Sequence, residues 1–137
     1  MAPEDLAALH ERAFTGQGRA WSASEFFELL QNDTILLVGD NNAFALGRVV
    51  ADEAELLTIV CDPECRRQGL ARDRLQMLEQ HAKESGASRI FLEVASTNTP
   101  AIQLYKHSQF TEIGRRKRYY DTPNGRVDAV VMEKCLG

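Results

Sequence analysis

The chain has 137 residues, which is enough for one domain with one hydrophobic core. Hydrophobic residues make up 44% of it and charged residues 26%, which is typical of a globular protein and excludes a disordered chain. The formal net charge of -4 argues against a general nucleic-acid binder, and no apolar run approaches the ~20 residues of a membrane-spanning helix. We therefore expect one domain, residues 1–137, with neither DNA nor a membrane among its partners.

The three cysteines, Cys61, Cys65 and Cys135, do not suggest disulfides or a metal site. An odd number cannot close a disulfide framework and no secretory signal is apparent, so we expect reduced thiols in a cytoplasmic protein. Cys61 and Cys65 have the spacing of half a zinc site, but no second pair or suitably spaced histidine completes it. We therefore expect no bound metal.

Two helices open the chain. Apolar residues at helical spacing predict a helix from Pro3 to about Phe14, which Gly16-Gln17-Gly18 ends. Ser22 or Ser24 can cap a second helix. The apolar side of this second helix is formed by Phe26, Phe27, Leu29 and Leu30.

Three strands follow, because the period of the apolar residues changes from helical to extended. Residues 34–39 and 43–50 are predicted to form a hairpin, since Asp40-Asn41-Asn42 between them is a turn signal. Residues 55–61 form a third apolar strand, which Asp62-Pro63 ends.

A long helix and a buried strand come next. A helix is predicted over residues 69–85, with Gly86 as its C-terminal stop. One face of that helix consists of Ala71, Leu75, Leu78 and Ala82. Residues 89–94 then form a largely apolar strand.

The last elements are a helix and a hairpin. Pro100 suits the first turn of a helix. Strands are predicted over about 110–120 and 127–134, and Asn124-Gly125 between them is a strong hairpin signal. The whole order, α-α-β-β-β-α-β-α-β-β, predicts an α/β (α+β) fold in which helices pack on a mixed sheet.

The loop Arg66-Arg67-Gln68-Gly69-Leu70-Ala71-Arg72 lies between a strand and a helix and has the composition of an anion site. Gly69 lets a ligand approach the backbone, and the helix presents unpaired N–H groups and a positive dipole end. A diphosphate fits this geometry. The loop lacks the ending of a Walker loop and the three glycines of a Rossmann fingerprint, so by itself an ordinary polar turn is an equal alternative.

Four blocks of the sequence stand in an order that one enzyme family shares. They are Arg66–Ala71, Leu92–Asn98, Ala101–Tyr105, and Arg118–Tyr120 followed by Gly125-Arg126 and Asp128-Ala129. These blocks resemble the Q/R-x-x-G-x-G/A, L-E-V-R-x-S-N, A-I-x-L-Y and R-x-Y-Y…G-R-x-D-A motifs of the GNAT family of N-acetyltransferases. The closest resemblance is to its RimI-type ribosomal-protein alanine N-acetyltransferases.

The resemblance implies the GNAT fold, a mixed and mostly antiparallel central sheet with flanking helices, whose strands splay around acetyl-CoA. The family normally has a short strand before its first helix. This chain opens directly into a helix, so we expect that strand to be absent or degenerate.

The resemblance also implies the site residues. Glu93 matches the general base of the family, and Tyr105 matches the general acid that protonates the departing coenzyme A thiolate. The implied cofactor-binding residues are Ile59, Val60 and Cys61 at the pantetheine arm, Arg67, Gln68, Gly69, Leu70, Ala71 and Arg72 at the pyrophosphate, and Asn98 at the next helix start. The structural alternatives are a solvent-facing glutamate, a core tyrosine and a simple helix cap.

The implied reaction is direct transfer of acetyl to a primary amine within a ternary complex. Neutralising a peptide α-amine of pKa ~8 at pH 7 costs about 1.4 kcal/mol, against about 4.6 kcal/mol for a lysine amine of pKa ~10.4. This favours the N-terminus of a peptide or protein as acceptor, and the resemblance suggests a ribosomal protein. Ala95, Thr97 and Ser108-Gln109 depart from the motifs, so a small amine or amino acid stays an alternative acceptor. A non-catalytic acyl-CoA-binding module is a third hypothesis, and a monomer and a homodimer are both open.

The one basic run is Arg115-Arg116-Lys117-Arg118. Because side chains alternate along a strand, we expect a solvated strand here and not one continuous patch. Contact with an acidic substrate or with the 3′-phosphate of coenzyme A is the alternative. We expect Trp21 to pack, and we assign no role to His10, His81 and His107.

Overall fold

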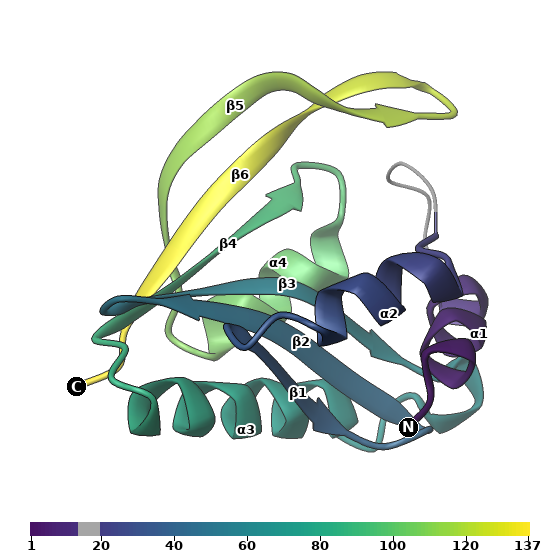
Figure 1. The fold of residues 1–137 in the computed structure, drawn as a ribbon. Helices are drawn as coiled ribbons and strands as arrows, with labels where there is room; N and C mark the ends of the chain where they lie inside the picture. The colour runs from purple at the N-terminus through teal and green to yellow at the C-terminus, as the bar shows by residue number, and fades with distance from the viewer. Residues whose placement is uncertain (14–19) are drawn as a thin grey trace.

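The computed structural model describes residues 1–13 and 20–137, which form one six-stranded sheet with helices packed on it (Figure 1). The strands lie in the order β1-β2-β3-β4-β6-β5. Neighbouring strands are antiparallel except β3 and β4, which run parallel. This confirms the prediction of a mixed, mostly antiparallel sheet flanked by helices.

The N-terminal helices are α1 (Pro3–Ala13) and α2 (Ala23–Leu30). The predicted end at Phe14 and the glycines at 16 and 18 lie outside the described residues. Ser22 is the N-cap of α2, since its hydroxyl accepts from the Glu25 N–H while the Glu25 carboxylate accepts from the Ser22 N–H. In the described chain no strand precedes α1, as expected.

The first hairpin consists of β1 (Ile35–Gly39) and β2 (Ala43–Val50), and β3 (Glu53–Cys61) follows. Gly39 has a φ of +113°, and a Cβ there would lie 2.3 Å from the Ala43 carbonyl oxygen, so the turn requires glycine. Arg74, on the helix that follows β3, contacts this turn. Its Nε donates to the same carbonyl at 3.0 Å, and its guanidinium pairs with Asp40.

The remaining elements match the predictions closely. After a short 3-10 turn (Pro63–Cys65), they are α3 (Leu70–Glu84), β4 (Arg89–Ala95), α4 (Thr99–His107), β5 (Thr111–Thr122) and β6 (Gly125–Cys135). The strand ends differ from those predicted by two residues at most, because the turn signals Asp40-Asn41-Asn42 and Asn124-Gly125 act locally. None of the described helices is long and apolar enough to cross a membrane.

The sheet is covered on both faces. One core cluster joins it to α3 and α4, and contains Leu75, Leu78 and Tyr105. The other joins it to α1 and α2, and contains Leu6 and Phe26. Because successive side chains of a strand point to opposite faces, the centre of the sheet contributes to both clusters.

The two central strands, β3 and β4, diverge halfway along their length. β3 and β4 pair only where residues 53–55 lie beside residues 89–91. Beyond that point β3 stays paired with β2 as far as Cys61, and β4 stays paired with β6 as far as Ala95. The edges that they turn toward each other therefore have no strand partner in the described chain, as the expected splay requires.

The last hairpin, β5 and β6, arches away from the sheet above β4 and toward α2 (Figure 1). Arg116 pairs with Ala129 and Tyr120 with Val127, so β5 contains two more residues than β6 in this stretch. Arg118 has a left-handed φ of +50°, and its N–H donates to the Asp128 carboxylate at 3.0 Å. The regular alternation expected for Arg115 to Arg118 was therefore wrong, because a bulge interrupts the strand.

Candidate active site

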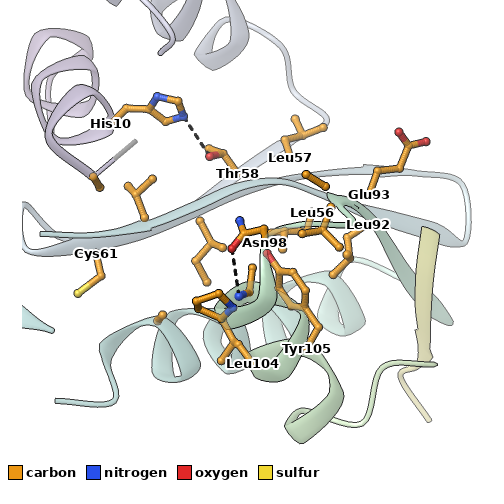
Figure 2. Close-up of a pocket in the computed structure, with 18 of the residues that line it drawn as sticks. His10, Leu56, Leu57, Thr58, Cys61, Leu92, Glu93, Asn98, Leu104 and Tyr105 are labelled. Atoms are coloured by element: carbon orange, nitrogen blue, oxygen red, sulfur yellow. Dashed lines mark hydrogen bonds between the residues drawn. The ribbon is translucent and has the colours of Figure 1, made fainter. Parts of the chain in front are cut away.

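A cleft of about 790 Å³ opens where β3 and β4 diverge (Figure 2). It is within the size range of small-molecule sites. Seven of the predicted site residues line it, namely Ile59, Val60, Cys61, Ala71, Glu93, Asn98 and Tyr105. The predicted residues Arg67, Gln68, Gly69, Leu70 and Arg72 do not line it; they lie on the loop and first helical turn at one end, where Arg66 and Ala71 are the lining residues.

Glu93 lies on β4 between two buried residues, Leu92 and Val94, that face α3 and α4. Alternation along the strand therefore turns Glu93 to the opposite face, toward the N-terminal helices (Figure 2). Its side chain is 21% exposed, and its Oε1 lies 2.9 Å from the Nε of Arg116. The structure thus places this carboxylate in the cleft, beside a cation.

Tyr105 reaches the cleft from the other face of the sheet (Figure 2). It lies on α4, is 6% exposed, and packs against Phe110 with the ring centroids 5.9 Å apart. Burial raises the pKa of Tyr105 well above its usual range, so the phenol keeps its proton at neutral pH. A group of this kind can donate a proton to a leaving group.

Asn98 is both the N-cap of α4 and a residue of the cleft wall. Its Oδ1 accepts from the Ala101 N–H at 3.3 Å. The helix-cap alternative is therefore correct, and it leaves the side chain at the cleft as well.

The β3 edge that faces the gap offers backbone groups of Ile59, Val60 and Cys61 to a ligand. Backbone N–H and C=O groups need partners, and an extended ligand with amide groups can pair with such an edge. The Cys61 thiol donates to the carbonyls of Asp62 and Cys65, at 3.5 and 3.6 Å. Burial raises its pKa, so the thiol stays protonated and is a poor nucleophile.

The loop before α3 is exposed and ends in an open helix terminus. Gly69 is the N-cap with a φ of +72°, and no side chain caps the helix. A Cβ on Gly69 would meet nothing within 4 Å, so the space above the first turn is open to a ligand. The unpaired N–H groups of this turn suit a phosphate.

His10 and Trp21 also line the cleft, and their rings stack 5.2 Å apart. The backbone N–H of Trp21 donates to His10 Nδ1 at 3.1 Å, and His10 Nε2 lies 3.2 Å from the Thr58 hydroxyl. Burial lowers the pKa of His10, which favours the neutral ring that these contacts require. Trp21 packs as expected, whereas no pattern in the sequence indicates that His10 lines the cleft.

Two charged residues near Glu93 were also missed. Arg116 was assigned to a solvated strand, and Glu55 on β3 was given no role. Glu55 interacts electrostatically with both Glu93 and Arg116, and burial raises its pKa. Tyr120 completes this side of the cleft, and burial, assisted by Glu93, raises its pKa to about 12. In the described chain, no group of three or more His, Cys, Asp or Glu residues is placed to hold a metal ion.

The sequence of this chain resembles those of known proteins. Residues 4–110 match the acetyltransferase (GNAT) family. The chain is 42% identical to the ribosomal protein bS18-alanine N-acetyltransferase of Escherichia coli (strain K12), over 93% of this chain and 89% of the relative.

The fold matches solved structures of the same kind. The crystal structure of the ribosomal-protein-S18-alanine N-acetyltransferase from Escherichia coli superposes with a TM-score of 0.87 over 98% of this chain and 88% of that one, with 33% identity between superposed residues. Arabidopsis thaliana NAA60, solved in complex with acetyl-CoA, shares the fold at 16% identity, with a TM-score of 0.83 over 98% of this chain and 93% of that one. The family match covers most of the chain and the sequence identity extends over nearly all of it, so this protein belongs to the acetyltransferase (GNAT) family and is an N-acetyltransferase.

Proposed function

We propose that this protein transfers an acetyl group from acetyl-CoA to the α-amine of a protein N-terminus, and that an alanine-terminated ribosomal protein is its acceptor. The observation that carries the proposal is a cleft that passes between β3 and β4, with Glu93 on one face and Tyr105 on the other. The activity named for the 42% identical relative from Escherichia coli supports the choice of acceptor. Such a substrate is made in the cytoplasm, which is where we expect the enzyme.

The residues that would hold acetyl-CoA follow from the shape of the cleft. The open β3 edge at Ile59, Val60 and Cys61 suits the amide groups of the pantetheine arm. The backbone from Arg67 to Arg72, at the uncapped start of α3, suits the pyrophosphate. Asn98 lines the same cleft and would contact the same ligand.

The acceptor enters from the side of Glu93, His10 and Trp21. Glu93 takes a proton from the ammonium group, directly or through one water, and the neutral nitrogen attacks the thioester carbonyl carbon in the gap. The C–N bond forms and the C–S bond breaks. Tyr105 gives its proton to the departing thiolate and is restored by the second proton of the nitrogen. One ammonium and one acetyl-CoA thus yield one amide, one coenzyme A thiol and one proton.

The proposed base fits an α-amine better than a lysine. Removing a proton at pH 7 costs about 1.4 kcal/mol for an amine of pKa ~8 and about 4.6 kcal/mol for one of pKa ~10.4.

A panel of acceptors tests the proposal through the release of coenzyme A thiol from acetyl-CoA. It contains an alanine-terminated peptide, the same peptide with its α-amine blocked, and free amines and amino acids. We expect turnover on the open peptide, none on the blocked one, and slower turnover on the small amines. Turnover on small amines alone would contradict the peptide assignment, and acetyl-CoA binding without turnover on any acceptor would favour a binding module.

A further inference from the structure

The proposed base already has a partner in the structure. The Nε of Arg116 lies 2.9 Å from Oε1 of Glu93, and it reaches across from β5, which is separated from β4 by β6. The Arg116 side chain is 56% exposed, so it approaches the carboxylate from the solvent side of the cleft. An acceptor amine carries the same charge and must reach the same carboxylate. Two cations therefore compete for Glu93.

The backbone that carries Arg116 is held firmly, whereas its side chain lies on the surface. Asp128 accepts from the Arg118 N–H at 3.0 Å and lies 3.9 Å from the guanidinium of Arg115, so it fixes the bulge of β5. The guanidinium of Arg116 lies over the exposed ring of Tyr119, 5.2 Å from its centroid. Exposed ion pairs contribute little, so the contact with Glu93 can be given up at low cost.

A second carboxylate stands nearby to receive the displaced arginine. Glu55 lies between Ala54 and Leu56, which are both buried in the α3 side of the sheet, so its side chain shares the face of Glu93. It pairs in register with Phe91, two residues before Glu93 on β4. Among the described residues no ion pair to Glu55 is formed, although Arg48 is its direct neighbour on β2.

We propose that Arg116 is a positioning residue that exchanges partners: it holds the Glu93 carboxylate while no acceptor is bound, yields that carboxylate to the acceptor amine, and moves toward Glu55. The inference rests on the proposed function, because it takes Glu93 as the group that meets the amine. While no acceptor is bound, the positive charge of Arg116 neutralises the Glu93 carboxylate. An acceptor must therefore carry a positive charge to replace Arg116 at this carboxylate.

Steady-state kinetics at saturating acetyl-CoA test the exchange, with whichever acceptor the wild-type enzyme turns over. Arg116→Gln removes the competitor, and we expect the KM for the acceptor to fall about two- to fivefold, the range that exposed ion pairs support. Arg116→Lys still pairs with Glu93 and should stay near the wild-type KM. Arg126→Gln is the matched control, since it removes an exposed arginine paired with Asp121 on the same hairpin, and it should leave the KM unchanged.

A double-mutant cycle tests the role of Glu55. Glu55→Gln should raise the acceptor KM when Arg116 is present, because the arginine loses its alternative partner, and should raise it much less in the Arg116→Gln background. A KM that rises or stays constant in Arg116→Gln, or a Glu55→Gln effect of equal size in both backgrounds, would overturn the exchange. Arg116→Met repeats the test if Arg116→Gln does not fold.

The same measurements separate this inference from the proposed function. If the wild-type enzyme turns over an acceptor and the Arg116 variants behave like the control, the exchange alone is wrong. If the wild-type enzyme turns over no amine at all, the proposed function is wrong and the exchange is wrong with it.

Discussion

Proton removal and proton delivery are assigned to residues on opposite faces of one sheet. Glu93 faces the N-terminal helices, and Tyr105 lies in the core cluster on the α3 and α4 side. Both can line one cleft because β3 and β4 separate beyond Glu55 and Phe91, which leaves a passage through the sheet. The acetyl group is expected to sit in that passage, between the two.

Substitution of each residue alone tests these roles. Glu93→Gln should lower kcat by about 10²- to 10⁴-fold, the usual contribution of a positioned base, and leave the acetyl-CoA Kd unchanged. Tyr105→Phe should lower kcat by less, because a thiol of pKa about 8.5 leaves as a thiolate without full protonation. Steady-state kinetics with a peptide acceptor measure kcat, and calorimetry measures the Kd for acetyl-CoA. Glu84→Gln, at an exposed position in the last turn of α3, is the control. A wild-type kcat in Glu93→Gln would exclude Glu93 as the base.

The residues of the site differ in how far the sequence reveals them. Glu93 is apparent because a carboxylate interrupts an apolar strand inside a recognisable motif, and Asn98 because it precedes a helix at a capping position. Arg116 and Glu55 are not apparent. Arg116 lies on β5, which β6 separates from β4, so its contact with Glu93 depends on how distant strands are arranged. Glu55 is brought beside β4 by a parallel pairing between residues distant in sequence.

Among the elements, the start of α3 is the one whose backbone is expected to bind a ligand. Gly69 has a left-handed φ of +72°, with open space where a side chain would stand. Gly86, just past the other end of the helix, has a φ of +98° and equally open surroundings. Both glycines therefore have a left-handed backbone conformation, but only Gly69 lies at the end of the cleft.

This pair separates cofactor binding from backbone strain. Gly69→Leu and Gly86→Leu should each destabilise the protein by about 1–2 kcal/mol, the cost of a left-handed residue with a side chain. Only Gly69→Leu should weaken acetyl-CoA binding, by about tenfold or more, and Arg67→Ala should weaken it less, because the N–H groups carry most of the pyrophosphate contact. Calorimetry measures the Kd values. A larger effect of Arg67→Ala, or an equal effect of Gly86→Leu, would contradict this division.

Element by element, the sequence predicts local structure better than it predicts how the strands meet. Apolar periodicity, Ser22 and Asn124-Gly125 locate the helices and hairpins to within two residues, because these signals act locally. The divergence of β3 and β4 has no local signal, and it was expected only from the resemblance to a family. The bulge in β5 was missed for the same reason, since it depends on Asp128 in another strand.

At the scale of the whole molecule, the phenol of Tyr105 is buried in the core and that of Tyr120 is half-buried on β5. Burial raises the pKa of Tyr105 far above 10 and that of Tyr120 to about 12. Above pH 10 the unfolded chain releases these protons while the folded protein keeps them, so the free energy of unfolding should be unaffected below pH 10 and should fall as the pH rises further.

Urea unfolding between pH 8 and pH 11 measures this dependence. In Tyr105→Phe one of the two phenols with a raised pKa is absent, so the loss of stability above pH 10 should be shallower than in the wild-type protein. Tyr119→Phe is the control, because that tyrosine is 50% exposed. Equal slopes in the wild-type protein and Tyr105→Phe would show that Tyr105 titrates as an ordinary exposed phenol.

The proposed function requires that the acetyl group is transferred to the N-terminal nitrogen and not to a lysine side chain. An alanine-terminated peptide with one internal lysine, incubated with the enzyme and acetyl-CoA, offers both amines at equal concentration. Fragmentation of the product in a mass spectrometer locates the added acetyl group. We expect the acetyl group on the N-terminal nitrogen, and we expect Glu93→Gln to abolish most of this product. Acetyl on the lysine side chain, or an unmodified peptide beside an enzyme that acetylates small amines, would contradict the proposed function.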